Sequence, residues 1–309
     1  MQLLNNFEGV ISYLAGRPRR KVAVVCPHDD HTREAIEDAL NRGIADFVFV
    51  GATDSELHRL SDLFPGHVQT VELSDSVESL DRDEAARHAV AMIRRGEADV
   101  LMKGLINTDN LLRAILNKVD GILAPGNVLT HITASQIQGM DRLLFFSDAA
   151  VIPAPTAEQF SSIVGYMADV CKAFGNVRPR IALIHCTEKT SEKFPVTLAY
   201  AEIKERASRG LYGNAVVDGP MDVKSALDIH SGELKGVAAK IEGRADGLVF
   251  PDIQAGNVFY KTISYFADSL NAGMLMGAQA PVVLPSRADS SRSKLCSLAM
   301  ACLYASTDK

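Results

Sequence analysis

Short apolar runs alternate with amphipathic stretches along nearly the whole chain. The runs are rich in Val, Ile, Leu and Phe and are apolar on both faces, which is typical of strands in a parallel sheet. They predict strands at 21–26, 46–51, 67–73, 99–104, 127–137, 142–148, 180–186, 214–219, 246–252, 273–277 and 281–285. The stretches between them predict helices at 31–43, 83–96, 108–118, 157–175, 198–210, 256–270 and about 289–305. This β-α-β order predicts an α/β fold built on a parallel sheet.

The length and composition fit two α/β lobes. The chain has 309 residues, of which 47% are hydrophobic and 23% are charged, so it can bury a sizeable core. We expect one domain to comprise residues 1–145 with 278–309 and the other to comprise residues 146–277, with a cleft between them. Ligands of open α/β sheets lie beyond the carboxyl ends of the strands, so site residues are expected there.

Charge and cysteine content narrow the class of protein. The net charge of −6 and the pI of about 5.8 argue against a nucleic-acid-binding surface. The five cysteines are scattered and odd in number, which predicts free thiols in a reducing cytosol. No run reaches the roughly 18 apolar residues of a membrane span, and the N-terminal stretch lacks the basic start of a signal peptide. We therefore expect a cytoplasmic protein with no nucleic-acid and no membrane partner.

Several familiar site motifs are absent. The sequence has no G-x-x-x-x-G-K-[ST], no G-x-G-x-x-G after the first strand, no G-x-S-x-G and no H-E-x-x-H. No Cys/His cluster has the spacing of metal ligands, so no metal site is predicted.

Polar residues follow the strand at 99–104. Lys103 ends this buried strand, where a lysine usually points into a cleft or finds a partner. Thr108 or Asp109 can cap the next helix, and plain capping is the simpler interpretation of both. Arg113 lies one turn inside that helix. Lys103, Thr108 and Arg113 are candidate substrate-binding residues.

A second polar group follows the strand at 246–252. Asp252 comes at its end, and Gly256 and Asn257 open the next predicted helix, where backbone N–H groups can approach an anion. Capping by Asn257 explains that residue about as well as a ligand does. Asp252, Gly256 and Asn257 are also candidate substrate-binding residues.

The third polar group lies between the last strand and the last helix. Ser286, Arg287 and Asp289 follow the strand within a few residues. A helix N-terminus binds phosphate through free N–H groups, and arginine binds it with two parallel hydrogen bonds. This turn is therefore a candidate phosphate cradle. The competing interpretation, equally supported by this stretch alone, is that Ser286 or Asp289 caps the helix and Arg287 is solvated.

Taken together, these stretches resemble a known family. LMKGLINTDNLLRAIL, VFPDIQAGNVFYK and GAQAPVVLPSRADSSRSKL, in that order, are similar to the phosphate acetyl/butyryltransferases. HDDHTREAIEDAL, FFSDAAVIPAPTAEQ and VDGPMDVKSAL are similar as well, so the resemblance covers nearly the whole chain. PDIQAGN and SRADS resemble the butyryl branch more closely than the acetyl branch.

The resemblance implies a fold and a reaction. The implied fold is a two-domain α/β structure similar to the isocitrate/isopropylmalate dehydrogenases, with the active site in the interdomain cleft of a homodimer or higher homo-oligomer. The implied reaction is the reversible transfer of a short-chain acyl group between CoA and inorganic phosphate, with butyryl as the expected group. Its substrates and products are acyl-CoA, phosphate and acyl phosphate, and it needs no cofactor.

The resemblance also assigns roles to residues. Ser286 and Arg287 match the family's Ser-Arg pair: Ser286 would hydrogen-bond phosphate or the tetrahedral intermediate, and Arg287 would hold phosphate oxygens. Arg113 would hold phosphate or the CoA diphosphate, and Gly256 and Asn257 would line the cleft from the other lobe.

One departure leaves the general base open. Acetyl members have an Asp seven residues after the Ser, and this chain has Ser293 there, which cannot act as a carboxylate base. Asp289 is the nearest substitute, and Asp148 at the end of another predicted strand is a second candidate. Either carboxylate must lie within hydrogen-bond reach of the CoA thiol, directly or through a water.

Three alternatives to a phosphate butyryltransferase are kept. The first is a phosphate acetyltransferase, because one methylene discriminates by only about 1–3 kcal/mol. The second is a metal- and nicotinamide-dependent decarboxylating dehydrogenase on the similar fold. The third is a non-catalytic CoA- or phosphate-binding protein that has lost its base.

Overall fold

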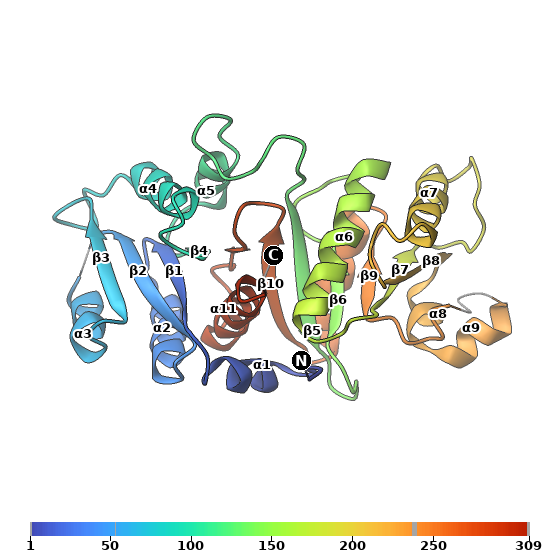
Figure 1. The fold of residues 1–309 in the computed structure, drawn as a ribbon, viewed down its shortest axis with the longest axis horizontal. Helices are drawn as coiled ribbons and strands as arrows, with labels where there is room; N and C mark the ends of the chain where they lie inside the picture. Colours follow the sequence, from blue (N-terminus) through green and yellow to red (C-terminus); the bar gives the residue numbers. More distant parts are fainter. Residues whose placement is uncertain (1, 53, 237–239, 308–309) are drawn as a thin grey trace. The chain divides into compact units, whose positions relative to one another are not determined.

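The computed structural model describes residues 2–52, 54–236 and 240–307. The chain divides into two compact units, whose elements are drawn in Figure 1. Unit 1 comprises Met1–Asn6 and Val128–Asn271, and unit 2 comprises Phe7–Asn127 and Ala272–Lys309. The domain boundaries expected from the sequence, at 145/146 and 277/278, stay a prediction.

Unit 2 is built on a mixed sheet with the strand order β3-β2-β1-β4-β11-β10. β1 pairs in parallel with β2 and β4, and β11 pairs in parallel with β4. Residues 22–25 of β1 are fully buried, as expected for a central strand that is covered on both faces. The strands are β1 (Arg20–Val25), β2 (Ala45–Gly51), β3 (Val68–Glu72), β4 (Val100–Lys103), β10 (Leu270–Met276) and β11 (Val282–Val283).

Helices cover both faces of this sheet. α4 packs with α5 on one face, and α11 packs with both α2 and α1 on the other (Figure 1). α11 buries residues all around its axis because it contacts α1, α2 and the strands β4 and β11. The helices are α1 (Phe7–Leu14), α2 (Asp30–Asn41), α3 (Ser55–Leu63), α4 (Arg82–Arg94), α5 (Thr108–Ile115) and α11 (Ser291–Ala305).

Unit 1 has the strand order β5-β6-β9-β7-β8, with β6, β9, β7 and β8 parallel to one another. An apolar cluster that includes Phe146, Leu248 and Phe250 fills the space between the sheet and α10. The strands are β5 (Thr130–Gln136), β6 (Leu144–Ser147), β7 (Arg180–Ile184), β8 (Val216–Met221) and β9 (Gly247–Val249). The helices are α6 (Ala157–Ala173), α7 (Val196–Ser208), α8 (Val223–Leu227), α9 (Ile229–Lys235) and α10 (Ile253–Phe266).

The predicted α/β class is confirmed, but the sheets are not purely parallel. β5 pairs with β6 antiparallel, and β10 pairs with β11 antiparallel. The connecting segments, residues 137–143 and 277–281, are too short for a parallel crossover, which needs about a dozen residues or more. The expectation of a parallel sheet is therefore wrong for these two pairs.

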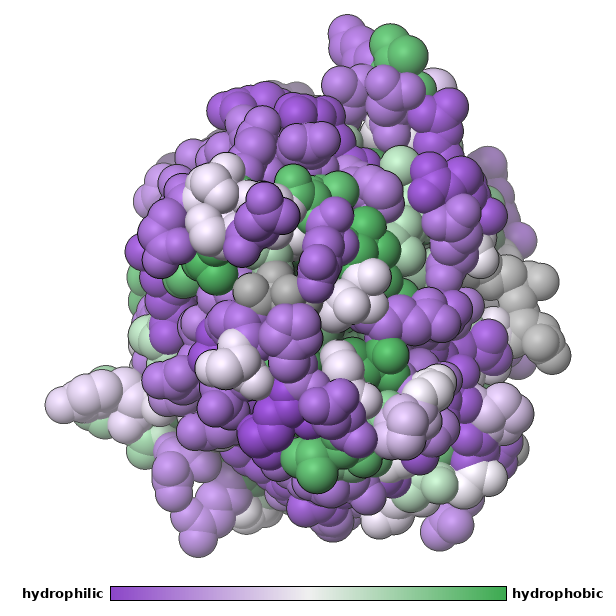
Figure 2. All heavy atoms as spheres, turned by 90° about the vertical axis from the view of Figure 1, so that its left-hand side faces the viewer, coloured by the Kyte–Doolittle hydropathy of each residue, from purple (hydrophilic) through white to green (hydrophobic). Residues whose placement is uncertain are grey.

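The surface of unit 2 is mostly polar where Figure 2 shows it. The side that carries β3 and α3 in Figure 1 faces the viewer there, and hydrophobic side chains form small groups separated by hydrophilic ones. None of the helices in the described part of the chain combines the length and the apolar character that a membrane span requires.

Candidate active site

Three neighbouring parallel strands of unit 2 end at the same edge of the sheet and carry polar residues there. β1, β4 and β11 are adjacent in the sheet. Asp29 lies just beyond β1, Lys103 ends β4, and Ser286 lies just beyond β11. The structure therefore places Lys103 and Ser286, both predicted site residues, at one edge with Asp29, which no sequence motif had singled out.

Residues 286–289, which we call the Ser-Arg turn, form a closed hydrogen-bonded loop. The Ser286 N–H donates to Oδ2 of Asp289 at 2.8 Å, and the Asp289 N–H donates to the Ser286 carbonyl at 3.2 Å. The Ala288 N–H donates to Oγ of Ser286 at 3.3 Å. Ser286 and Arg287 are exposed, so the turn presents a hydroxyl and a guanidinium to solvent.

The cap of α11 is not the one expected from the sequence. Neither Ser286 nor Asp289 caps the helix: Ser290 does, by accepting a hydrogen bond from the Ser293 N–H at 3.2 Å. Asp289 instead folds the Ser-Arg turn, because its carboxylate accepts from the start of that turn. The capping explanation of Ser286 and Asp289 is therefore wrong, which leaves the Ser286 hydroxyl exposed for another use.

Arg287 is held by a residue at the start of α5. Its Nη2 donates to Oδ1 of Asn107 at 3.2 Å. Asn107 occupies the N-cap position of α5, where Thr108 or Asp109 had been expected, but its side chain makes no capping hydrogen bond. An asparagine at this position normally accepts from the helix N–H groups. Here the amide oxygen positions the guanidinium of Arg287 instead.

Lys103 is buried without a counter-charge at hydrogen-bond distance in the described part of the chain. It is 4% exposed, and its Nζ donates to the carbonyl oxygens of Gly104 at 3.3 Å and Pro285 at 3.5 Å. Burial lowers the pKa of Lys103, and the positive charges of Lys294 and Arg287 lower it further. Its contact with Pro285 places the ammonium directly beside the Ser-Arg turn.

Lys294 and Asp29 form a partly buried ion pair that links α11 to α2. The side chain of Lys294 is 2% exposed, and its Nζ lies 2.6 Å from Oδ1 of Asp29 and 3.0 Å from Oγ1 of Thr32. Asp29 also caps α2 by accepting from the Thr32 N–H at 3.0 Å. Burial raises the pKa of Asp29, but the hydrogen bonds from Lys294 and Thr32 outweigh it, so the pKa lies below its usual value.

The other two predicted residues of unit 2 lie on α5. Thr108 is the first residue of the helix and is exposed. Arg113 is also exposed, and its Nη1 lies 3.7 Å from a carboxylate oxygen of Asp83 on α4. An exposed pair of this kind contributes little to stability, so Arg113 is available to an anionic ligand.

In unit 1, the predicted residues of α10 serve the fold of a neighbouring turn. Asp252, not Asn257, caps α10, by accepting from the Ala255 N–H at 2.8 Å. A Cβ on Gly256 would lie 2.1 Å from the carbonyl oxygen of Asp148, so only glycine lets the helix approach so closely. Nδ2 of Asn257 donates to the Ala149 carbonyl at 3.0 Å. The predicted cap and helix start at 256–257 are therefore wrong by one turn.

The carboxylate of Asp148 accepts hydrogen bonds from the residues around it. It is buried just beyond β6, and Oδ1 accepts from the N–H groups of Ala150 at 2.7 Å and Val151 at 2.9 Å. Oδ2 accepts from the hydroxyl of Thr130 at 2.8 Å and from two further N–H groups. Five donors occupy the carboxylate, which makes it a structural residue of this turn.

The two clusters differ in what they can do. The edge of unit 2 presents a hydroxyl, a guanidinium and a buried ammonium, which together suit the oxygens of phosphate. The cluster of unit 1 offers a rigid, closely packed turn. Among the residues that the structure describes, no group of three or more His, Cys, Asp or Glu side chains could hold a metal ion.

Known proteins are similar in sequence to most of this chain. Residues 70–302 match the model of the family described as phosphate acetyl/butaryl transferase. The phosphate butyryltransferase of Clostridium acetobutylicum is 37% identical over 303 residues, which cover 98% of this chain and 99% of that protein. The phosphate acetyltransferase of Thermotoga maritima is 30% identical over 93% of this chain and 95% of that protein.

Solved structures agree in fold. A branched-chain phosphotransacylase from Enterococcus faecalis V583 has a TM-score of 0.79 at 26% identity, over 94% of this chain and 100% of that one. A putative 4-hydroxythreonine-4-phosphate dehydrogenase from Salmonella typhimurium has a TM-score of 0.55 at 13% identity, over 93% and 100%, and this likeness concerns the fold alone. The predicted similarity to the dehydrogenase-like fold is confirmed.

The chain belongs to the phosphate acetyl/butyryltransferase family. It is a phosphate acyltransferase, and its family implies acyl-CoA and phosphate as substrates.

Proposed function

We propose that the chain is a phosphate butyryltransferase, which transfers a butyryl group reversibly between CoA and inorganic phosphate. The observation that carries the proposal is the Ser-Arg turn, whose hydroxyl and guanidinium are exposed beside the buried ammonium of Lys103. The similarity to named butyryltransferases over nearly the full length supports the butyryl branch, as do PDIQAGN and SRADS.

In the proposed mechanism, Arg287 holds two oxygens of phosphate while Asn107 fixes its guanidinium. The Ser286 hydroxyl donates to phosphate or to the oxyanion of the tetrahedral intermediate. Lys103 adds positive potential from behind the turn. In one direction a phosphate oxygen attacks the acyl carbonyl, the C–S bond breaks and CoA leaves as a thiol after taking up a proton. In the other direction CoA gives up that proton, attacks the same carbon, and phosphate leaves.

We assign the proton transfer to Asp289. Its Oδ2 accepts the Ser286 N–H, and its Oδ1 accepts no hydrogen bond from the residues that the structure describes, so it can accept a proton from the CoA thiol. Asp148 is set aside as a base because five donors already occupy its carboxylate.

The remaining residues are proposed to bind the rest of the substrate. Arg113 and Thr108 at the start of α5 are assigned to the anionic part of acyl-CoA. Asp252, Gly256 and Asn257 are assigned to the shape of the acyl-CoA site in unit 1, through the helix start and the close turn that they organise.

The test is a panel of acyl-CoAs from acetyl to hexanoyl, each incubated with the purified protein and phosphate while CoA release is followed with a thiol reagent. We expect release that depends on phosphate and is fastest with butyryl-CoA. A maximum at acetyl-CoA would assign the chain to the acetyl branch. A folded protein that binds CoA but releases none from any substrate would refute catalysis and leave a binding protein.

Lys103→Met separates the functional from the structural role of this lysine. Because the folded-state pKa of Lys103 lies below the usual lysine value of 10.5, the folded protein binds fewer protons than the unfolded chain between the two pKa values. Stability therefore rises with pH in that interval, and at pH 7 the buried charge is a net cost. We expect Lys103→Met to raise the free energy of unfolding at pH 7 and to lower kcat/KM by about tenfold or more.

Urea denaturation at pH 7 and the acyl-transfer assay measure the two effects of Lys103→Met. Lys118→Met, at an exposed lysine of the same unit, is the matched control and should change neither quantity. Unchanged turnover in Lys103→Met would remove Lys103 from the site.

We propose a homodimer on the basis of α10. Val258, Tyr265 and Phe266 are large apolar residues of this helix that are mostly exposed, Tyr265 by 83%. A contiguous patch of exposed apolar side chains marks a surface that contacts another protein or a membrane. Light scattering should give twice the chain mass for the wild type and a lower mass for Tyr265→Ser/Phe266→Ser. An unchanged mass in a folded variant would exclude α10 as the dimer contact.

A further inference from the structure

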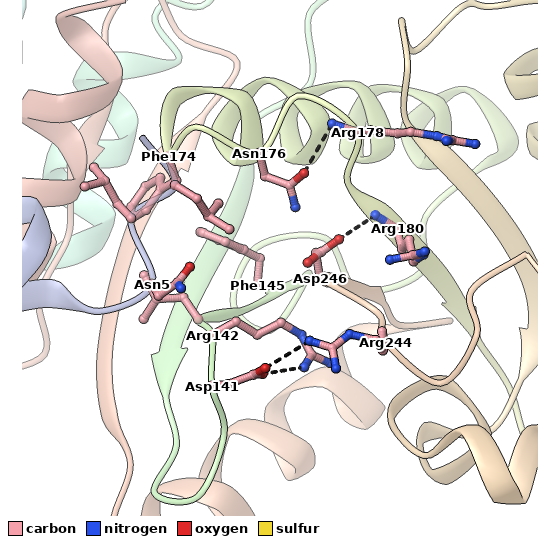
Figure 3. A pocket seen from close by; sticks show the side chains of 13 residues that line it. Asn5, Asp141, Arg142, Phe145, Phe174, Asn176, Arg178, Arg180, Arg244 and Asp246 are labelled. Carbon is pink, nitrogen blue, oxygen red and sulfur yellow. Dashed lines mark hydrogen bonds and ion pairs between the residues drawn. The ribbon is translucent and has the colours of Figure 1, made fainter. Parts of the chain in front are cut away.

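Unit 1 contains a polar cavity, which we call the arginine pocket. It has a volume of about 280 Å³ and is lined by Arg142, Arg178, Arg180 and Arg244 together with Asp141 and Asp246. Figure 3 shows Arg142 and Arg244 converging on Asp141 at one side, with Asp246 and Asn176 pointing into the same space. Arg178 extends away from this centre in the view, so the pocket proper is made by the other three arginines.

The arginine pocket lies at the edge of the sheet opposite to Asp148 and Asp252. Arg142 precedes β6, Arg180 is the first residue of β7, and Arg244 precedes β9. These three strands are parallel to one another. Their amino ends therefore carry the arginines, while Asp148 and Asp252 follow the carboxyl ends of β6 and β9. The pocket is separate from the predicted acyl-CoA residues of this unit by the length of the strands.

The charges of the pocket are balanced, so an anionic ligand would be held by hydrogen bonds from the arginines. The guanidinium groups of Arg142, Arg180 and Arg244 face the carboxylates of Asp141 and Asp246, and Arg180 also pairs with Glu242 at 2.7 Å. Burial raises the pKa of Asp246, so this carboxyl is protonated more readily than an exposed one, which shifts the balance toward positive charge.

The arginines keep hydrogen-bond donors for such a ligand. Arg142 is fixed by bonds from Nε and Nη2 to the Ala245 carbonyl at 3.3 and 3.2 Å and by Nη1 to Asp141 at 3.0 Å. Arg244 donates from Nη2 to Asp141 at 2.9 Å. A guanidinium has five N–H donors, so Arg244 and Arg180 retain several beyond these ion pairs. The pocket thus combines Arg142, which is held by three hydrogen bonds, with Arg244 and Arg180, which retain donors for a carboxylate or phosphate.

We propose that the arginine pocket binds a small polyanion, a molecule with two or more neighbouring carboxylate or phosphate groups. Paired guanidinium groups match several anionic groups better than one, because each can take two parallel hydrogen bonds. Drug-sized ligands occupy pockets of about 300–1,000 Å³, so this cavity suits a tricarboxylate or a pyrophosphate and is too small for a nucleotide or for CoA. The site is additional to the one that handles phosphate and acyl-CoA.

The experiment is calorimetric titration of the intact protein at low salt with citrate and with pyrophosphate, one probe for each source of the anionic groups. Butyrate, with a single carboxylate, is the control ligand. Arg244→Gln and Arg180→Gln remove one guanidinium each. Arg209→Gln is the matched control, since Arg209 is an exposed arginine of unit 1 paired with Glu205 and distant in sequence from the pocket. Arg287→Ala reports whether a polyanion binds at the Ser-Arg turn instead.

We expect one of the two polyanions to bind saturably, with an affinity that falls about tenfold or more in Arg244→Gln and Arg180→Gln and is unchanged in Arg209→Gln and Arg287→Ala. Binding should weaken strongly between low salt and about 1 M salt, where charges are screened within about 3 Å. Binding lost in Arg287→Ala and retained in the two pocket variants would overturn the proposal, as would no saturable binding of either polyanion. Each result is independent of the acyl-CoA assay, so the two proposals fail separately.

Discussion

Arg287→Ala is expected to lower kcat/KM for acyl transfer by about a hundredfold or more, while the protein remains folded. The guanidinium is exposed at the Ser-Arg turn and is held by Asn107 rather than by a carboxylate, so it carries its full charge to a ligand. Its removal takes away two parallel hydrogen bonds to phosphate, the strongest interactions that the site can offer. Because the residue is exposed, the free energy of unfolding should change by no more than about 0.5 kcal/mol.

Steady-state kinetics with butyryl-CoA and varied phosphate measure this effect. Arg287→Lys keeps the charge but loses the planar fork, and it should recover only part of the activity. The control is Arg292→Ala: Arg292 lies five residues further on and is bound to Glu8 of α1 at 2.9 Å. Near-normal turnover in a folded Arg287→Ala protein would contradict the assignment of the Ser-Arg turn.

The sequence predicted the parts of the site that depend on strand ends. The runs at 21–26, 99–104 and 281–285 are apolar on both faces, and the structure makes them the adjacent strands β1, β4 and β11. Polar residues after buried strands must lie at the sheet edge, so Lys103 and Ser286 could be placed from the pattern alone. Their proximity followed from the order of the strands, which apolar periodicity does not encode.

Helix starts were predicted less well, and for a physical reason. Several residues near each start can act as the cap, and only the tertiary partners decide between them. The side chain of Asn107 does not cap α5, because its oxygen accepts a hydrogen bond from Arg287. Asp289 does not cap α11, because its carboxylate closes the Ser-Arg turn. The competition between local and long-range hydrogen bonds is visible only once residues far apart in sequence are brought together.

The ion pair of Asp29 and Lys294 was not predicted from the sequence. Lys294 lies within a helix of mostly apolar residues, and nothing in its surroundings indicates that its partner is 265 residues away. A lysine in such a position signals a buried partner, since an unpaired ammonium is rarely tolerated in a core. Lys103 is also buried, but in the described part of the chain its ammonium donates to carbonyl oxygens and not to a carboxylate. The difference between these two lysines is why one is expected to stabilise the fold and the other to serve the reaction.

Asp29→Asn is expected to lower the free energy of unfolding by about 3 kcal/mol, because it leaves the ammonium of Lys294 buried without its counter-charge. The side chain of Lys294 is 2% exposed, whereas that of Asp29 is 28% exposed. Lys294→Met should therefore cost much less, since the carboxylate left behind reaches water and still caps α2 through the Thr32 N–H. Asparagine is also a good cap, so Asp29→Asn changes the charge and little else.

The contribution of the Asp29 carboxylate to the free energy of unfolding should depend on pH in a defined direction. The folded-state pKa of Asp29 lies below the usual aspartate value of 3.8, so the folded protein binds fewer protons than the unfolded chain between the two pKa values. The stabilisation by this carboxylate is present above pH 3.8 and is lost as the pH falls through the lower, folded-state pKa. Asp29→Asn should abolish that part of the acid dependence.

Urea denaturation of both single variants and of Asp29→Asn/Lys294→Met measures the coupling between the two residues, and the double variant should be more stable than Asp29→Asn alone. A larger loss in Lys294→Met than in Asp29→Asn would show that the buried ammonium is not the costly partner.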